Sequence, residues 1–235
     1  LQDILKIENV HIANASSVYA IPIAHYVFSQ ILRWNKRIDH HIEYQQSKNW
    51  APIAGDGELT NKTLVILGYG GIGSQVAKLG KAFGMRVTGI RRNPQDDEHA
   101  DEVLGLDRFE ELLPLTDYLV LALPDSPQTR DIINADILEK LNTSAMIINV
   151  GRGTAINEVD LADALNNGKI AAAALDTTKI EPLDTNSSLW MAKNCFISAH
   201  DSAHSLLSLG RAFELFFKNI KNIKNSDRVI NLYSE

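Results

Sequence analysis

The chain has 235 residues, of which 45% are hydrophobic and 22% are charged, as in ordinary globular proteins. Its net charge of −6 at pH 7, without a long lysine- or arginine-rich cluster, argues against a nucleic-acid-binding surface. The most apolar stretch, residues 18–34, is interrupted by Pro22, His25 and Ser29, and no signal-peptide pattern stands at the N-terminus. The composition therefore predicts a cytoplasmic protein with no nucleic-acid or membrane partner.

Residues 18–33 are predicted to form one long helix, followed by a polar arm that we define as residues 35–57. The helix is too apolar for a free surface helix, and the aromatic part of the arm ends at Trp50. Both features predict a symmetric homodimer, with packing inside the same chain as the alternative. His40 and His41 stand in the arm without matching ligands, so we interpret them as a solvated pair and predict no metal site.

From residue 63 onward, apolar runs alternate with helical patterns. Since such runs are apolar throughout rather than alternating, they predict parallel strands covered by helices on both faces, in a doubly wound α/β sheet. A last helical pattern, residues 205–224, is predicted to close the fold. The predicted strands are residues 63–67, 86–90, 118–123, 145–149, 171–175 and 195–198, and the helices between them are residues 72–83, 109–113, 135–140 and 158–166.

The first predicted strand leads directly into glycines with the spacing GxGxxG, at Gly68, Gly70 and Gly73. The first glycine permits a tight turn, the second lets the backbone approach a pyrophosphate, and the third lets the next helix pack closely on the sheet. The N–H groups at the start of that helix then meet the anion. This context predicts a dinucleotide-binding domain of the Rossmann type, the alternative being a glycine-rich turn without a ligand.

The second predicted strand ends in Arg91 and Arg92. An acidic residue about 20 residues after the first glycine usually binds the ribose hydroxyls of NAD. Here no carboxylate follows the strand directly, and two guanidinium groups offer planar donors to a 2′-phosphate. The pattern favours NADP over NAD, with a solvated pair of surface arginines as the alternative.

Three charged side chains follow other predicted strands: Arg152, Glu181 and His200. Each alone has a structural explanation, as a surface arginine, a solvated acid or a histidine at a strand end. Ligands of open α/β sheets collect at the carboxyl ends of the strands, so three such residues together predict an active site.

The order of these segments resembles the D-isomer-specific 2-hydroxyacid dehydrogenases, and is most similar to their glyoxylate/hydroxypyruvate reductase branch. The resemblance covers nearly the whole chain and rests on motifs at residues 9–14, 68–73, 121–130, 149–153, 174–182, 189–190, 197–200 and 229–231. It implies that Arg152 binds the substrate, that His200 is the acid/base and that Glu181 is the partner of His200. One departure is Ala199, which stands where the family usually has proline.

The resemblance and the glycine motif together imply the residues along the cofactor. Asp176 is expected to meet the nicotinamide carboxamide, and Thr129 to line the cofactor path with main-chain groups of its neighbours. The implied cofactor-binding residues are Gly68, Gly70, Gly71, Ile72, Gly73, Arg91, Arg92, Leu123, Pro124, Thr129, Val150, Gly151, Arg152, Asp176 and His200.

The resemblance also implies two domains with the active site in the cleft between them. Residues 1–17 would end the substrate domain and residues 18–200 would form the dinucleotide-binding domain, with 18–62 as the long helix and dimerisation arm. Residues 201–235 would be a C-terminal helix returning to the substrate domain. Family members carry a further N-terminal segment, so the resemblance implies that this chain lacks most of the substrate domain.

The residue types suit reduction of a ketone. Hydride addition leaves an alkoxide that needs a proton, which the imidazolium of His200 can donate near neutral pH. Glu181 would favour the charged imidazole and fix its orientation, while Arg152 can hold the carboxylate of a 2-oxoacid and polarise its carbonyl. We therefore predict hydride transfer between NAD(P)H and a small 2-oxoacid or D-2-hydroxyacid, such as glyoxylate or hydroxypyruvate.

A different class of function stays open at this point. Corepressor-like, dinucleotide-sensing interaction proteins resemble the same family and can keep all three charged residues without turning over a substrate. Another Rossmann enzyme, such as a methyltransferase, is disfavoured because it would not explain the order Arg152, Glu181, His200.

Overall fold

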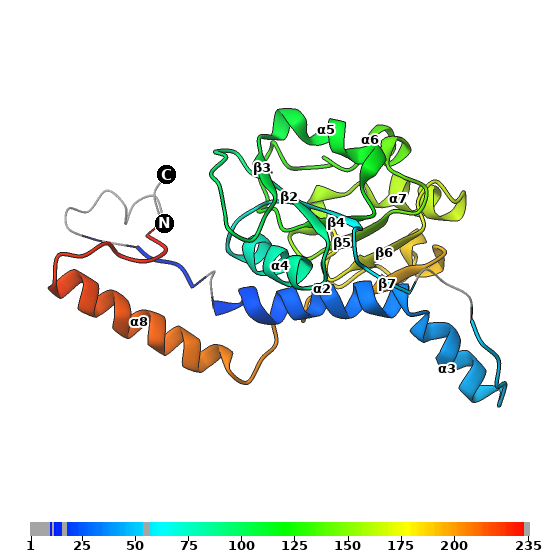
Figure 1. The fold of residues 1–235 in the computed structure, drawn as a ribbon, viewed down its shortest axis with the longest axis horizontal. Helices are drawn as coiled ribbons and strands as arrows, with labels where there is room; N and C mark the ends of the chain where they lie inside the picture. Colours follow the sequence, from blue (N-terminus) through cyan, green and yellow to red (C-terminus); the bar gives the residue numbers. More distant parts are fainter. Residues whose placement is uncertain (1–9, 11, 16–17, 54–56, 233–235) are drawn as a thin grey trace.

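The computed structural model describes residues 10, 12–15, 18–53 and 57–232, which form a parallel sheet covered by helices (Figure 1). The sheet has the strand order β3-β2-β1-β4-β5-β6-β7, and every neighbouring pair is parallel. This confirms the doubly wound α/β fold. Its strands are β1 (Thr63–Leu67), β2 (Arg86–Ile90), β3 (Glu102–Leu104), β4 (Tyr118–Leu121), β5 (Met146–Asn149), β6 (Ala172–Leu175) and β7 (Cys195–Ile197).

The helices between the strands begin where the sequence offers caps. The Asn134 side chain accepts from the Ile137 N–H at the start of α6, and Asn157 accepts from the Asp160 N–H at the start of α7. The helices are α2 (Ala20–Asn35), α3 (Ile38–Gln46), α4 (Gly71–Ala82), α5 (Phe109–Leu112), α6 (Ala135–Lys140), α7 (Glu158–Asn166) and α8 (Ser208–Lys224). Short 3₁₀ turns are η2 (Leu106–Arg108), η3 (Leu113–Leu115), η4 (Gly153–Ala155) and η5 (Ser188–Met191).

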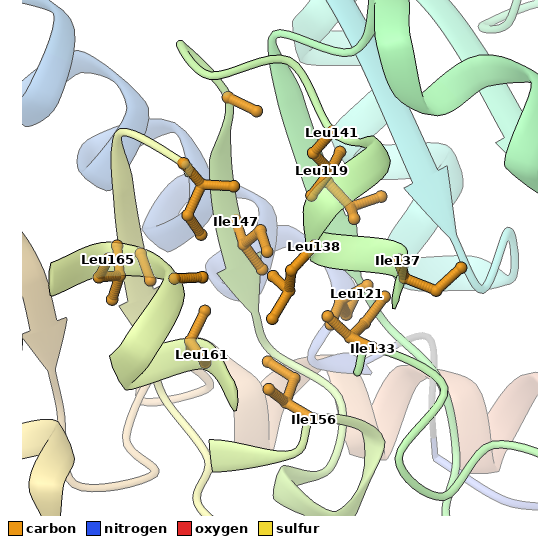
Figure 2. Packing of buried hydrophobic residues seen from close by; sticks show 14 of the residues in the cluster. Leu119, Leu121, Ile133, Ile137, Leu138, Leu141, Ile147, Ile156, Leu161 and Leu165 are labelled. Atoms are coloured by element: carbon orange, nitrogen blue, oxygen red, sulfur yellow. The ribbon is translucent and has the colours of Figure 1, made fainter. Parts of the chain in front are cut away.

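Two hydrophobic cores lie on opposite faces of the sheet. Val65 and Leu67 of β1 belong to the core under α5, α6 and α7, part of which is shown in Figure 2. Their neighbours Leu64 and Ile66 belong to the other core, under α2 and α4. Because successive side chains of a strand point to opposite faces, a strand buried on both faces must be apolar at every position.

Helix α2 contributes a whole face to the second core. Its buried apolar residues include Ile23, Val27 and Ile31, and Phe28 stacks on Phe83 with ring centroids 5.2 Å apart. The apolarity of this helix is thus explained by packing inside its own chain, which is the alternative that the sequence left open. Exposed apolar residues remain in the arm, at Ile38, Ile42 and Trp50.

Two elements have no counterpart in the sequence prediction. Strand β3 is three residues long at the edge of the sheet, and Val103 is its only buried residue, so no apolar run announces it. Helix α3 lies in the polar arm, where no helix was predicted, and none of its residues is buried. Both elements carry too little buried apolar surface to show periodicity.

The C-terminal helix forms as predicted, but it does not close the fold. No residue of α8 is buried, and Leu209, Phe213 and Phe217 are more than half exposed. Figure 1 shows α8 lying apart from the sheet. The segment after it meets the N-terminal region, where the Asn14 N–H donates to the Asn231 carbonyl at 3.1 Å. A return of this helix to a substrate domain stays a prediction.

Gly89 on β2 gives a test of the packing between β2 and the glycine turn. A Cβ at this position would overlap the ring of Tyr69, which is 3% exposed. Overpacking a core costs about 1 to 3 kcal/mol, and at this chain length each kcal/mol lowers Tm by about 2 to 4 °C. Gly89→Ala should therefore lower Tm in thermal unfolding. Gly210→Ala is the control, since a Cβ there meets only open space. A Gly89→Ala variant with the Tm of the wild type would contradict the packing described.

Candidate active site

The glycine turn lies at the point where the strand order reverses. The chain proceeds outward from β1 to β2 and β3 and then returns to place β4 on the other side of β1. Gly68 has φ +103°, and a Cβ there would lie 2.6 Å from the Ala122 carbonyl oxygen, just beyond β4. Only glycine fits both the conformation and the approach. Crevices at such a reversal are where open α/β sheets bind ligands.

Helix α4 presents its N-terminus at this crevice. A Cβ on Gly70 would meet nothing within 4 Å, whereas one on Gly73 would lie 2.9 Å from the Gly68 carbonyl oxygen. These are the open and the tightly packed positions that the spacing predicts. The first turn holds no acidic residue, and no side chain of the described residues caps it. Its N–H groups and dipole are therefore suited to a pyrophosphate.

Arg91 and Arg92 lie just beyond β2, with Arg91 half-buried and Arg92 exposed. Asp97 is the second acidic residue after these arginines. Its carboxylate accepts from the His99 N–H at 2.9 Å and from Ser74 Oγ of α4 at 3.4 Å. Burial acts to raise the pKa of Asp97, but the hydrogen bond from the His99 N–H and the nearby Tyr69 hydroxyl outweigh it and lower the pKa. This carboxylate is thus already held by the protein.

His200 and Glu181 form a pair, with His200 Nδ1 2.8 Å from Glu181 Oε2. The other oxygen of Glu181 accepts from the Thr178 N–H at 3.1 Å, which fixes the carboxylate between the loops after β6 and β7. The side chains are 46% and 40% exposed, respectively. A carboxylate at Nδ1 leaves Nε2 of the imidazole free to face a substrate.

His200 adopts a left-handed backbone conformation with φ 55°, which costs a residue other than glycine about 1 to 2 kcal/mol. The conformation is held by its N–H, which donates to the Asp176 carbonyl at 2.9 Å. Ala199, the residue where the family usually has proline, precedes it. The position of the imidazole therefore depends on hydrogen bonds to the loop after β6 rather than on a rigid neighbour.

A cavity of about 510 Å³ lies beside the pair. It brings together three predicted site residues, Asp176, Glu181 and His200, from the ends of β6 and β7. Asp176 is 1% exposed, so its carboxylate is buried at the cavity wall. The cavity is lined by Asp176, Thr178, Glu181, Pro182, Leu183, Trp190, Ile197, Ser198, Ala199 and His200.

Arg152 does not join this group. It follows β5, where the buried Asn149 side chain fixes the turn by accepting from the Gly151 N–H and donating to the Arg152 carbonyl. The guanidinium is exposed, and its Nη1 donates to the Gly151 carbonyl at 2.7 Å. Arg152 is not among the residues that line the cavity. The structure therefore pairs His200 with Glu181 and leaves Arg152 bonded to its own turn.

The remaining predicted cofactor residues lie in the loops after β4 and β5. A Cβ on Gly151 would lie 2.6 Å from the Leu123 carbonyl oxygen, so the two loops touch through their backbones. Thr129 Oγ1 donates to the Pro124 carbonyl at 2.8 Å, which shapes the loop. Val150 is 5% exposed. These residues gather at the same edge as the glycine turn, while their contact with a cofactor stays a prediction.

Sequence reasoning missed two residues of the site: Ser198, which lines the cavity, and Tyr26 of α2, which contacts Ser198. The Ser198 hydroxyl and the Tyr26 phenol lie 2.7 Å apart, although 172 positions separate them in the chain. No local pattern announces such a contact. Within the described part of the chain, no helix is long and apolar enough to cross a membrane, and no group of three His, Cys, Asp or Glu residues is arranged to hold a metal ion.

Residues 28–202 match the family model described as D-isomer specific 2-hydroxyacid dehydrogenase, NAD binding domain. The chain belongs to this family. The match spans the sheet, the glycine turn and the His200–Glu181 pair, and it confirms the resemblance found in the motifs.

Individual relatives agree with this assignment. The chain is 34% identical over 204 residues to human glyoxylate reductase/hydroxypyruvate reductase, covering 84% of this chain and 62% of the relative. It is 35% identical over 201 residues to glyoxylate reductase of Aeropyrum pernix, covering 81% and 59%. Across six curated relatives, the chain spans 57% to 71% of their own lengths.

Solved structures show the same architecture. A D-isomer specific 2-hydroxyacid dehydrogenase family protein from Aeromonas salmonicida has a TM-score of 0.85 and 30% identity, over 99% of this chain and 75% of that one. A D-isomer specific 2-hydroxyacid dehydrogenase from Xanthobacter autotrophicus, in complex with NADPH and MES, has a TM-score of 0.81 and 26% identity, over 97% and 94%.

Proposed function

We propose that this chain carries the cofactor site and the acid/base pair of an NADPH-dependent reductase of small 2-oxoacids such as glyoxylate or hydroxypyruvate. The observation that carries the proposal is the 2.8 Å contact between His200 Nδ1 and Glu181 Oε2 beside a cavity at the carboxyl edge of the sheet. Relatives named glyoxylate or hydroxypyruvate reductases support the substrate class.

NADPH, when bound, would supply the hydride. The open N-terminus of α4 would receive the pyrophosphate, and Asp176 would accept a hydrogen bond from the nicotinamide carboxamide. His200 would hold a proton on Nε2 and deliver it to the substrate oxygen, because Glu181 at Nδ1 favours the doubly protonated ring. Arg152 would exchange its bond to the Gly151 carbonyl for the substrate carboxylate, a stronger charge-assisted partner.

The preference for NADPH is tested by the Arg91→Ala/Arg92→Ala variant. A charge-assisted contact to the 2′-phosphate contributes about 1.5 to 3 kcal/mol, so its loss should weaken NADPH binding roughly 10- to 100-fold and leave NADH binding unchanged. Fluorescence titration of both cofactors measures this. Arg86→Ala is the control, because this exposed arginine begins β2, at the end of the strand opposite Arg91. Equal affinities of the wild type for the two cofactors would contradict the preference.

The catalytic roles are tested by steady-state kinetics of the full-length protein across a panel of 2-oxoacids. His200→Ala should lower kcat by at least about 100-fold with NADPH binding intact, since proton donation contributes about 10²- to 10⁴-fold.

Glu181→Gln should move the alkaline limb of the pH profile toward lower pH, because the imidazolium loses its charged partner. Arg152→Lys should raise KM and lower kcat together, because a point charge cannot replace the planar fork.

His25→Ala serves as the histidine control, since His25 is exposed on α2. Wild-type kinetics in His200→Ala would remove this residue from the mechanism. NADPH binding without turnover of any 2-oxoacid would instead favour the dinucleotide-sensing interaction protein.

We further propose that the protein forms a homodimer through the arm. Ile38 and Ile42 lie one turn apart on α3 and are 43% and 48% exposed, and the Trp50 side chain is fully exposed. Since no residue of α3 is buried within its own chain, a second copy is the partner that symmetry favours.

Sedimentation equilibrium at micromolar concentration should give the mass of a dimer for the wild type. Ile42→Glu should shift the equilibrium toward the monomer, because it places a charge in the apolar contact. Gln45→Glu adds the same charge to the same helix and is the control. A wild-type chain that sediments as a monomer would refute the role given to the arm.

A further inference from the structure

The segment that carries His200 is tied to one buried side chain. The Asp176 carboxylate accepts from Ser198 Oγ at 2.7 Å, from the Asp201 N–H at 3.0 Å and from the Ser202 N–H at 3.2 Å. The main-chain carbonyl of Asp176 accepts from the His200 N–H at 2.9 Å. Residues on both sides of His200 are therefore held by one residue at the end of β6.

Tyr26 of α2 extends this network through Ser198. Tyr26 Oη lies 2.7 Å from Ser198 Oγ. The serine hydroxyl has one proton and gives it to Asp176, so the phenol must donate to the serine. Burial raises the pKa of Tyr26 to about 12, so the phenol keeps this proton throughout the neutral range. The order of donation is thus fixed as Tyr26 to Ser198 to Asp176.

We infer that Tyr26 and Ser198 are positioning residues that hold the His200 imidazole against Glu181 by acting through the buried carboxylate of Asp176. The inference rests on the proposed function, in which His200 is the acid. Two observations carry it. The left-handed backbone of His200 needs bonds to hold it, and the N–H groups of His200 and of the next residue, Asp201, both donate to Asp176. The carboxylate in turn takes its only side-chain hydrogen bond among the described residues from Ser198.

Kinetics of the full-length protein give the first test. Ser198→Ala removes a charge-assisted bond and should lower kcat about 10-fold or more, while Tyr26→Phe removes a neutral bond one step further away and should lower it about 2- to 10-fold. In both variants the alkaline limb of the pH profile should move toward lower pH, because the imidazolium is held less firmly against Glu181. Ser198→Thr keeps the hydroxyl and should restore kcat and the profile.

The matched control is Ser144→Ala, whose hydroxyl bonds to Asn142 before β5 begins, away from the carboxyl edge. A purely structural role for the two hydroxyls would lower Tm without moving the pH profile of the folded protein. Variants with wild-type kcat and wild-type pH profile would overturn the inference.

A second readout does not depend on activity. In protein labelled with ¹⁵N-histidine, the ring nitrogens of His200, assigned by their loss in His200→Gln, report protonation and the bond at Nδ1. Ser198→Ala and Tyr26→Phe should shift the Nδ1 signal away from its wild-type position, because the imidazole is held less firmly against Glu181, and Ser198→Thr should not. If the wild type turns over no 2-oxoacid but these shifts appear, the proposed function fails and the positioning network stands. If turnover is present and the signals of both variants match the wild type, the network fails and the proposed function stands.

Discussion

The carboxyl edge of the sheet depends on backbone approaching backbone more closely than any side chain would allow. A Cβ on Gly68 would lie 2.6 Å from the Ala122 carbonyl oxygen, and one on Gly151 would lie 2.6 Å from that of Leu123. A Cβ on Gly153 would overlap the main chain of Thr178. These contacts join the loops after β1, β4, β5 and β6 in series. The crevice, the Arg152 turn and the Glu181 loop therefore keep a fixed spacing without help from long side chains.

A buried carboxylate organises the other half of the same edge. Asp176 is almost inaccessible to solvent, and an unpaired charge there would be costly. Its hydrogen-bond donors come from the loop after β7. The carboxylate therefore obtains its hydrogen bonds only when that loop adopts its folded path. The glycine contacts bring the loops together, and Asp176 then determines the path of the last one. The position of His200 follows from both.

Strands β1, β2, β4, β5 and β6 could be predicted because nearly all of their residues are buried, so local apolarity reflects tertiary position. Strand β3 and helix α3 lack that burial and were missed. The motif order predicted Glu181 as the partner of His200, and their side chains lie 2.8 Å apart in the structure. The chain from Tyr26 to Ser198 to Asp176 could not be predicted, because it joins a helix at the start of the sequence to loops near its end. α8 is amphipathic by pattern, yet periodicity cannot tell which surface its apolar face meets.

The exposure of the His200–Glu181 pair shapes what its geometry can do. With side chains 46% and 40% exposed, the pair is screened by water, and exposed ion pairs contribute only about 0 to 1 kcal/mol. The short contact is therefore not explained by its own strength, and the main-chain bonds from Thr178 to Glu181 and from His200 to Asp176 must hold the two groups in place. A substrate and any protein surface that covers the 510 Å³ cavity would remove that water. The attraction would then strengthen when the imidazole has to carry its proton, because charges interact more strongly in a dry site.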